Sequence, residues 1–168
     1  MAFEHTLRVR FHQADPAGVL FYGRLFELVE ETYEAFCRAA GLDIDALMRQ
    51  EGLTTPVVRA SADFTRPMRV GEQVTVRLTV ARLGNASFTL DYDFLCANGE
   101  PRAKARVVHV FVDATCWRKH AIPDDVRERL ARDAYGPAAS AAATSDRSSL
   151  PDEVRGSGAD HQTASRGT

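Results

Sequence analysis

The feature that most limits the fold of this 168-residue chain is one long helix pattern near its start, followed by a series of strand patterns. Apolar residues recur at helical spacing from Arg24 to Ala40, and Gly41 stands where such a helix would stop. A shorter helix pattern covers residues 45–51. One early helix followed by antiparallel strands predicts an α+β fold, and its simplest packing wraps the sheet around the helix.

The strands are predicted from alternation of apolar and polar residues. Residues 7–11 alternate ahead of the helix, and residues 74–81 and 87–96 alternate after it. Residues 107–112 form an almost continuous apolar run, which is typical of a strand covered on both faces. Asn98-Gly99 predicts a hairpin in which both turn residues take positive φ.

The last part of the chain is predicted to close the domain and then continue as a tail. Gly84-Asn85 is a second turn candidate, and a short helix within residues 123–135, with Pro123 in its first turn, would close the domain. Residues 136–168 are rich in small and charged side chains and contain no aromatic residue. Such a segment buries too little apolar surface to offset its ordering entropy. We therefore predict one domain over residues 1–135 and a disordered tail over 136–168.

Composition excludes several classes of function. The formal net charge of -2 gives no basic footprint for nucleic acid. Three cysteines form no framework or Cys-x-x-Cys pair, which favours a reducing compartment and predicts a cytoplasmic protein. No apolar run approaches the length of a membrane span, and the N-terminus does not have the pattern of a signal peptide. No cluster of histidines suggests a metal site, and nothing indicates an organic cofactor.

The segment 15–22 places a carboxylate just ahead of the long helix. Asp15 precedes a proline, which holds it extended, and Gly18 permits a tight turn. The first N–H groups of the helix, near Tyr22 and Gly23, have no intrahelical partner and carry partial positive charge. A nucleophile or base beside an anion-binding helix end supplies the two parts that acyl transfer needs.

The run His12–Tyr22, with Asp-Pro-Ala-Gly at residues 15–18, resembles the active-site motif of the 4-hydroxybenzoyl-CoA thioesterase family. This family consists of hotdog-fold enzymes that hydrolyse acyl-CoA thioesters. The resemblance therefore implies a hotdog fold and an acyl-CoA substrate. It covers about residues 5–130 and continues through short segments in the same order: Thr55–Val58, Asp63–Phe64, Arg66–Pro67, Gly71–Glu72, Ala86–Phe88, Val110–Asp113 and Ile122–Pro123.

The resemblance also implies roles for individual residues. Asp15 matches the catalytic carboxylate, as nucleophile or as general base, and the backbone N–H of Tyr22 matches the oxyanion donor. Glu30 stands where related aromatic-acyl thioesterases place an acid near the acyl group, although a surface charge is the alternative. His12 would tune Asp15 or orient water, unless it only bonds within a turn. Gly18 shapes the loop around the substrate.

Three further residues are assigned to substrate binding. Thr55 belongs to a segment that suits compact acyl groups, and Ser87 matches a serine that follows a basic, phosphate-binding cluster in a better-known relative. That cluster is replaced here by residues 84–86, Gly-Asn-Ala, so Arg82 is the nearest substitute. A basic strand face offers another source of cations, or is an ordinary solvated face: Arg102, Lys104 and Arg106.

We therefore predict hydrolysis of aromatic or short- to medium-chain acyl-CoA esters. Acyl carrier protein thioesters and a non-catalytic acyl-CoA-binding module are the alternatives. A hydratase on the same fold is disfavoured, because Leu20 occupies the position of the histidine in hydratase motifs. A single wrapped sheet leaves unpaired strand edges, so we expect a homodimer or homotetramer joined through them.

Overall fold

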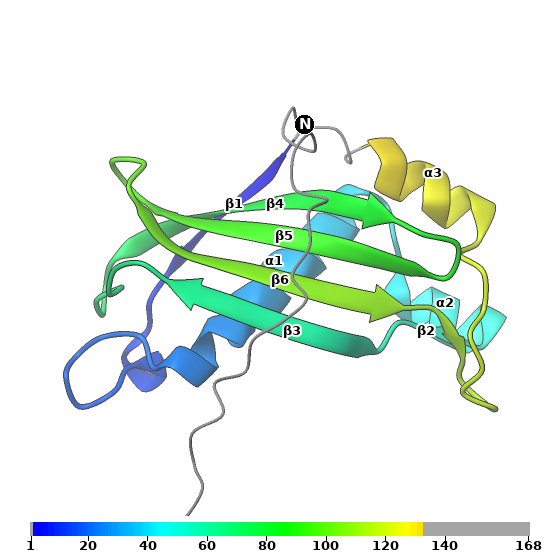
Figure 1. Cartoon of the computed structure of the whole chain (residues 1–168), viewed down its shortest axis with the longest axis horizontal. Coiled ribbons are helices and arrows are strands. Elements are labelled where there is room, and N and C mark those ends of the chain that lie inside the picture. The colour runs from blue at the N-terminus through cyan, green and yellow to red at the C-terminus, as the bar shows by residue number, and fades with distance from the viewer. Residues whose placement is uncertain (1, 133–168) are drawn as a thin grey trace, which may run out of the picture.

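An antiparallel sheet of five strands forms the body of the protein, in the order β1-β4-β5-β6-β3 (Figure 1). The computed structural model describes residues 2–132, so the predicted tail at 136–168 lies outside the described residues. The strands are β1 (Phe3–Arg8), β3 (Val57–Phe64), β4 (Gln73–Leu83), β5 (Ser87–Cys96) and β6 (Pro101–Val110). A second, two-stranded sheet pairs β2 (Leu53–Thr54) with β7 (Val112–Asp113).

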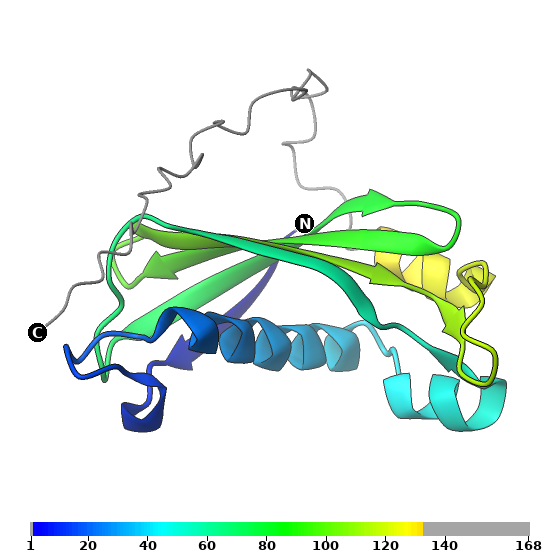
Figure 2. The same cartoon turned by 60° about the horizontal axis from the view of Figure 1, so that its bottom comes forward.

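Helix α1 (Leu25–Ala39) lies along one face of the large sheet, as the sequence pattern predicts (Figure 2). It buries Leu25, Leu28, Val29, Thr32 and Phe36 against the inner residues of the strands. Gly41, with φ of +69°, follows the helix end. The inner face of the sheet and this face of α1 therefore form one apolar core.

Two shorter helices lie near the C-terminal end of α1. Helix α2 (Ile44–Glu51) is capped by the Asp43 side chain and ends at Gly52, whose φ of +63° is left-handed. Helix α3 (Asp124–Arg132) packs against β4 and follows Pro123, in agreement with the predicted closing helix. No helix within residues 2–132 is long and apolar enough to cross a membrane.

The predicted hairpin at Asn98-Gly99 joins β5 to β6, but its turn differs from the prediction. Only Gly99 has positive φ, at +81°, and its N–H donates to the Cys96 carbonyl at 2.8 Å. The loop is therefore three residues long, a turn followed by one left-handed glycine. A register shift between Phe94 and Leu95 accommodates the extra residue.

The first strand is shorter than its alternation predicts. β1 ends at Arg8, and Phe11, which was expected to continue it, begins a 3₁₀ turn (Phe11–Gln13) and is 86% exposed. The chain turns here because the backbone N–H of Gln13 bonds the Arg10 carbonyl at 3.0 Å. Alternation alone could not show where strand pairing with β4 stops.

Charged residues on the outer face of the sheet are mutually paired. Within the described residues, Arg106 bonds Asp91 at 2.6 Å, Lys104 lies 3.4 Å from Asp93, and Arg102 bonds Glu72 at 2.7 Å. Of the two readings of this basic strand face, the structure favours a solvated face whose charges are balanced by carboxylates.

Candidate active site

Asp15 lies in a closed loop that runs from Ala14 to Leu20, which we call the Asp15 loop. Ala14 and Leu20 pair as an antiparallel bridge, and the Asp15 N–H donates to the Val19 carbonyl at 2.9 Å. Inside this bridge the Gly18 N–H donates to the Asp15 carbonyl at 2.9 Å, closing a turn with proline at its second position. Gly18 has φ of +74°, so the glycine predicted to permit the turn does so.

The Asp15 carboxylate is held through one of its two oxygens. Oδ1 accepts the N–H of Ala17 at 2.9 Å and, more weakly, that of Val19 at 3.4 Å. Oδ2 has no donor within the described residues, and the side chain is half-buried. The loop therefore orients the carboxylate and leaves one oxygen available for chemistry.

The N-terminal end of α1 follows immediately. Tyr22–Arg24 form a 3₁₀ turn that continues into α1, and Phe21, in extended conformation, is its N-cap. The Arg24 N–H donates to the Phe21 carbonyl, whereas the N–H groups of Tyr22 and Gly23 have no acceptor among residues 2–132. These two donors stand at the positive end of the helix dipole, where an anion is stabilised.

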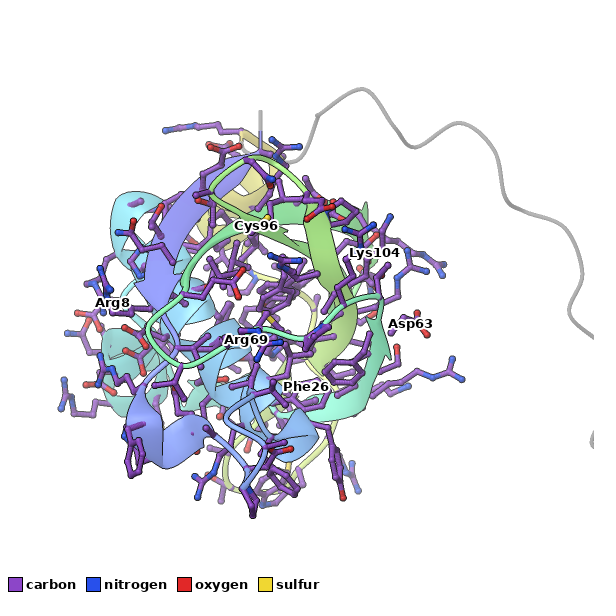
Figure 3. All side chains as sticks on the ribbon, turned by 90° about the vertical axis from the view of Figure 1, so that its left-hand side faces the viewer. Arg8, Phe26, Asp63, Arg69, Cys96 and Lys104 are labelled. Carbon is purple, nitrogen blue, oxygen red and sulfur yellow. The ribbon has the colours of Figure 1, made fainter. Side chains whose placement is uncertain are left out.

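The Asp15 loop is pinned by the segment that joins β3 to β4, residues 65–72, which we call the crossover. Leu20 donates its N–H to the Met68 carbonyl at 2.8 Å, and Val70 donates to the Gly18 carbonyl at 3.2 Å. Figure 3 views the molecule from this end and labels Arg69 of the crossover and Phe26 of α1. One segment distant in sequence thus holds the Asp15 loop in place.

Two other predicted site residues, His12 and Glu30, lie at this end of the molecule. His12 is exposed in the 3₁₀ turn before the loop. Glu30 is exposed on α1, yet neighbouring protein partly desolvates its carboxyl and Glu34 repels its charge, so its pKa is raised. This partly desolvated carboxyl lies five residues after Leu25, the first residue of α1.

Within one chain, the remaining predicted residues lie far from Asp15. Thr55 precedes β3, and Arg82 and Ser87 flank the β4–β5 turn. This end of the molecule carries α2 and α3, at the other end of α1 from the Asp15 loop (Figures 1 and 2). A helix of 15 residues spans about 22 Å, so these residues do not reach the Asp15 loop of their own chain.

Thr55 belongs to a buried aromatic cluster. Its carbonyl lies 3.1 Å from Nδ1 of His109, and the His109 ring stacks between Tyr33 and Phe88 with centroid distances of 4.8 Å on each side. Burial lowers the pKa of His109, and it raises the pKa of Cys37 to about 11. An apolar void of about 10 Å³ beside Tyr33, Thr55 and Phe88 has room for about one water.

The sequence reading overlooked Gln13 and Glu27. Gln13 is buried, and its side chain bonds both the Arg10 backbone and the Glu27 carboxylate. Gln13 lies three residues after Arg10, the residue before the turn, which is the capping-box spacing, and that spacing was the available signal. Within residues 2–132, no three His, Cys, Asp or Glu side chains gather in a metal-binding arrangement.

An antiparallel sheet wrapped around one long helix is the hotdog fold, which this protein shares with thioesterases of known structure. The chain belongs to the thioesterase-like superfamily, whose family model matches residues 9–130. The matched region contains the Asp15 loop, α1 and every strand of the large sheet except β1. The chain is accordingly a thioester hydrolase.

Several relatives are named as hydrolases or thioesterases of aromatic acyl-CoA esters. The chain is 32% identical over 139 residues to a 1,4-dihydroxy-2-naphthoyl-CoA hydrolase of Nostoc punctiforme, covering 81% of this chain and 93% of that protein. A solved 1,4-dihydroxy-2-naphthoyl-CoA thioesterase from Synechocystis has a TM-score of 0.74 at 23% identity, over 78% of this chain and 96% of that one. A gentisyl-coenzyme A thioesterase has a TM-score of 0.68 at 24% identity, over 76% and 99%.

Proposed function

We propose that this protein hydrolyses aromatic acyl-CoA thioesters, with Asp15 as the reactive carboxylate and the N–H of Tyr22 as the principal oxyanion donor. One observation carries the proposal. The Asp15 loop presents a free carboxylate oxygen at the end of the molecule where Tyr22 and Gly23 present N–H groups without acceptors. A thioester carbonyl placed between them would meet both a nucleophile or base and a stabilising pair of donors.

Two routes use the same groups. As general base, Asp15 takes a proton from water, whose oxygen attacks the thioester carbonyl carbon. The carbon–sulfur bond then breaks, and the CoA thiolate is protonated. As nucleophile, the free oxygen of Asp15 attacks that carbon, the CoA thiolate leaves, and water hydrolyses the resulting mixed anhydride. In both routes the negative charge on the carbonyl oxygen develops toward the Tyr22 N–H.

The relatives and the site support an aromatic, hydroxylated acyl group. The relatives named above act on dihydroxynaphthoyl-CoA and gentisyl-CoA. Glu30, with its raised pKa, offers this end of α1 a polar group that bonds a ring hydroxyl either as acceptor or, when protonated, as donor. An aliphatic chain would leave this group without a partner, which disfavours such substrates.

The test is hydrolysis of a panel of acyl-CoA esters, measured as the release of free thiol. The panel contains 1,4-dihydroxy-2-naphthoyl, gentisyl, benzoyl, hexanoyl and decanoyl esters. Wild type is compared with Asp15→Asn and with Asp45→Asn, an exposed carboxylate on α2 that serves as the matched control. We expect Asp15→Asn to lose at least about 100-fold in kcat and Asp45→Asn to retain wild-type rates.

Two outcomes would refute the proposal. Full activity in Asp15→Asn would place the chemistry elsewhere, and absence of thiol release from every ester would exclude acyl-CoA hydrolysis. If hexanoyl or decanoyl esters were the preferred substrates, the aromatic assignment would be wrong while the role of Asp15 would stand.

We also propose that two chains pair through β3. This strand is an edge of the large sheet, and its inner row, Val57, Ala60, Ala62 and Phe64, faces the α1 side because these residues pair with buried residues of β6. Val57 and Phe64 are each 50% exposed, and Val58 on the bulge is exposed too. A long edge strand with apolar side chains and no charged protection on its inner face invites a second strand.

Such pairing would assemble the separated substrate residues. The Phe64 end of β3 leads into the crossover that holds the Asp15 loop, and the Val57 end follows Thr55. Antiparallel pairing about a two-fold axis would set the Phe64 end of one strand beside the Val57 end of the other. The Asp15 loop of one chain would then lie near Thr55 of its partner, with Ser87 and Arg82 toward the same end.

Sedimentation equilibrium tests this assembly. We expect at least a dimer at micromolar concentration for wild type and for Ala131→Lys on α3. Ala60→Lys places a charge on an exposed inner position of β3, so the monomer should fold while the pair should dissociate and lose activity. A monomeric and fully active wild type would refute the paired site.

We also propose a reducing, cytoplasmic location for this protein. Its three cysteines, which form no disulfide, support this proposal.

A further inference from the structure

Gln13 is one of three polar residues that the core of residues 2–132 buries, with 4% of its surface exposed. Its side-chain Oε1 accepts the Arg10 N–H at 2.9 Å, and its Nε2 donates to Oε2 of Glu27 at 3.3 Å. Its backbone carbonyl accepts the Phe21 N–H at 2.9 Å. One buried residue thus connects three segments: the chain leaving β1, the residue before Tyr22, and the first turn of α1.

These connections lie next to both reactive groups. Asp15 is two residues after Gln13, and Tyr22 directly follows Phe21, whose N–H Gln13 holds. A displacement of Gln13 therefore moves the Asp15 loop and the start of the helix relative to each other. Reacting groups must be held within about 0.5 Å of their productive geometry, and the required rigidity comes from residues whose own bonds are fixed.

We propose that Gln13 is a positioning residue that fixes the Asp15 carboxylate relative to the oxyanion donor of Tyr22, with Glu27 as its anchor on α1. The inference rests on the proposed function of this site. Gln13 touches neither the free oxygen of Asp15 nor the Tyr22 N–H, so it acts through the placement of the backbone and does not itself react.

The anchor is also electrostatically suited to the site. A lone carboxylate in the first turn of α1 would repel an anion that forms at the helix start. Glu27 is paired instead with the Arg24 guanidinium, which lowers the pKa of the Glu27 carboxyl, and Gln13 contributes a second bond. Glu27 can therefore hold Gln13 while its charge is balanced by Arg24.

An exchange of the two side chains tests the pair. In Gln13→Glu two carboxylates face each other, and in Gln13→Leu both side-chain bonds are lost. The double variant Gln13→Glu/Glu27→Gln restores one donor and one acceptor at the contact and leaves the summed charge of residues 13, 24 and 27 unchanged. Residue 13 can still accept the Arg10 N–H. We expect each single variant to lower kcat about 10- to 100-fold with KM changed less than about 3-fold. The double variant should recover to within about 3-fold of wild type.

The matched control is Thr32→Val. Thr32 is fully buried in the middle of α1, where its hydroxyl bonds the Leu28 carbonyl at 2.8 Å, so this change removes a buried hydrogen bond away from the site. It should leave kcat within about 3-fold of wild type, whatever its effect on the melting temperature.

The possible results separate the inference from the proposed function. Wild-type kcat in folded Gln13→Leu, or equal losses of kcat in Thr32→Val and Gln13→Leu, would overturn the positioning role. The role would also be overturned if the folded double variant Gln13→Glu/Glu27→Gln had the same low kcat as Gln13→Glu. This second comparison tests the positioning role even if Gln13→Leu does not fold. Failure of the proposed function is seen separately, as an inactive wild type or a fully active Asp15→Asn.

Discussion

Removal of one backbone N–H tests the oxyanion site directly. Tyr22→Pro deletes the donor without a change of charge, and the fold should accept it for two reasons. Tyr22 is the first residue of its 3₁₀ turn, where the N–H has no intramolecular partner and proline is favoured. Phe21 already has φ of -62° and ψ of 131°, the extended conformation that a residue before proline requires. We expect unfolding free energy to change by about 0.5 kcal/mol or less.

Catalysis should respond very differently. Loss of one oxyanion donor costs about 2.7–4 kcal/mol of transition-state stabilisation, which is about 10²–10³ in kcat. Gly23 retains the second free N–H, so the residual rate should exceed the uncatalysed rate. KM should change little, because the donor meets its charged partner only in the transition state.

The assay is thiol release under saturating acyl-CoA, with Tyr22→Ala as control. Tyr22→Ala keeps the N–H but removes the ring, which is 69% exposed and lies against Phe21 with a centroid distance of 4.5 Å. It should retain wild-type kcat to within a few-fold. Equal activity in folded Tyr22→Pro and Tyr22→Ala would refute the assignment of the oxyanion donor.

Other predictions concern stability and its dependence on pH. Burial lowers the pKa of His109 below its value of about 6.5 in the unfolded chain, so the contribution of the neutral ring to stability is full above pH 6.5 and is lost as pH falls. The fall in melting temperature between pH 7 and pH 5 should therefore be smaller in His109→Phe than in wild type. The raised pKa of Glu30 makes its charge unfavourable at neutral pH, so Glu30→Gln should melt higher than wild type at pH 7, a difference that should vanish at pH 4. Phe36→Ala removes a fully buried ring at the centre of the core and should cost about 3–5 kcal/mol in urea unfolding; a loss below 1 kcal/mol would contradict its place there.

The elements with strong periodicity could be predicted from sequence alone. The helix pattern over 24–40 corresponds to α1 at 25–39, and the alternating segments correspond to β4 and β5. Their apolar spacing reports directly which face meets the core, so it needs no knowledge of the rest of the chain. The tight turn around Gly18 was likewise fixed by local chemistry, a proline followed by a glycine.

Features set by distant contacts could not be predicted in the same way. β3 was not predicted, because the bulge between Val57 and Arg59 breaks its alternation and two of its inner positions are small alanines, Ala60 and Ala62. Gln13 reads as a polar loop residue, because its partner Glu27 and the helix start that buries it are brought there by the fold. The distance between Asp15 and Thr55 within one chain was also hidden, because sequence motifs give order along the chain and no separation in space.

The crossover has a consequence for how the enzyme acquires activity as it folds. It joins β3 at one edge of the sheet to β4 beside the other edge strand, and on its way it bonds the Asp15 loop through Leu20 and Gly18. The loop therefore gains its supports only after contacts some 50 residues apart in sequence have formed, which are slow to close. In refolding, catalytic turnover should appear after helix formation seen by circular dichroism. The recovery of enzyme activity would therefore report when the sheet is complete.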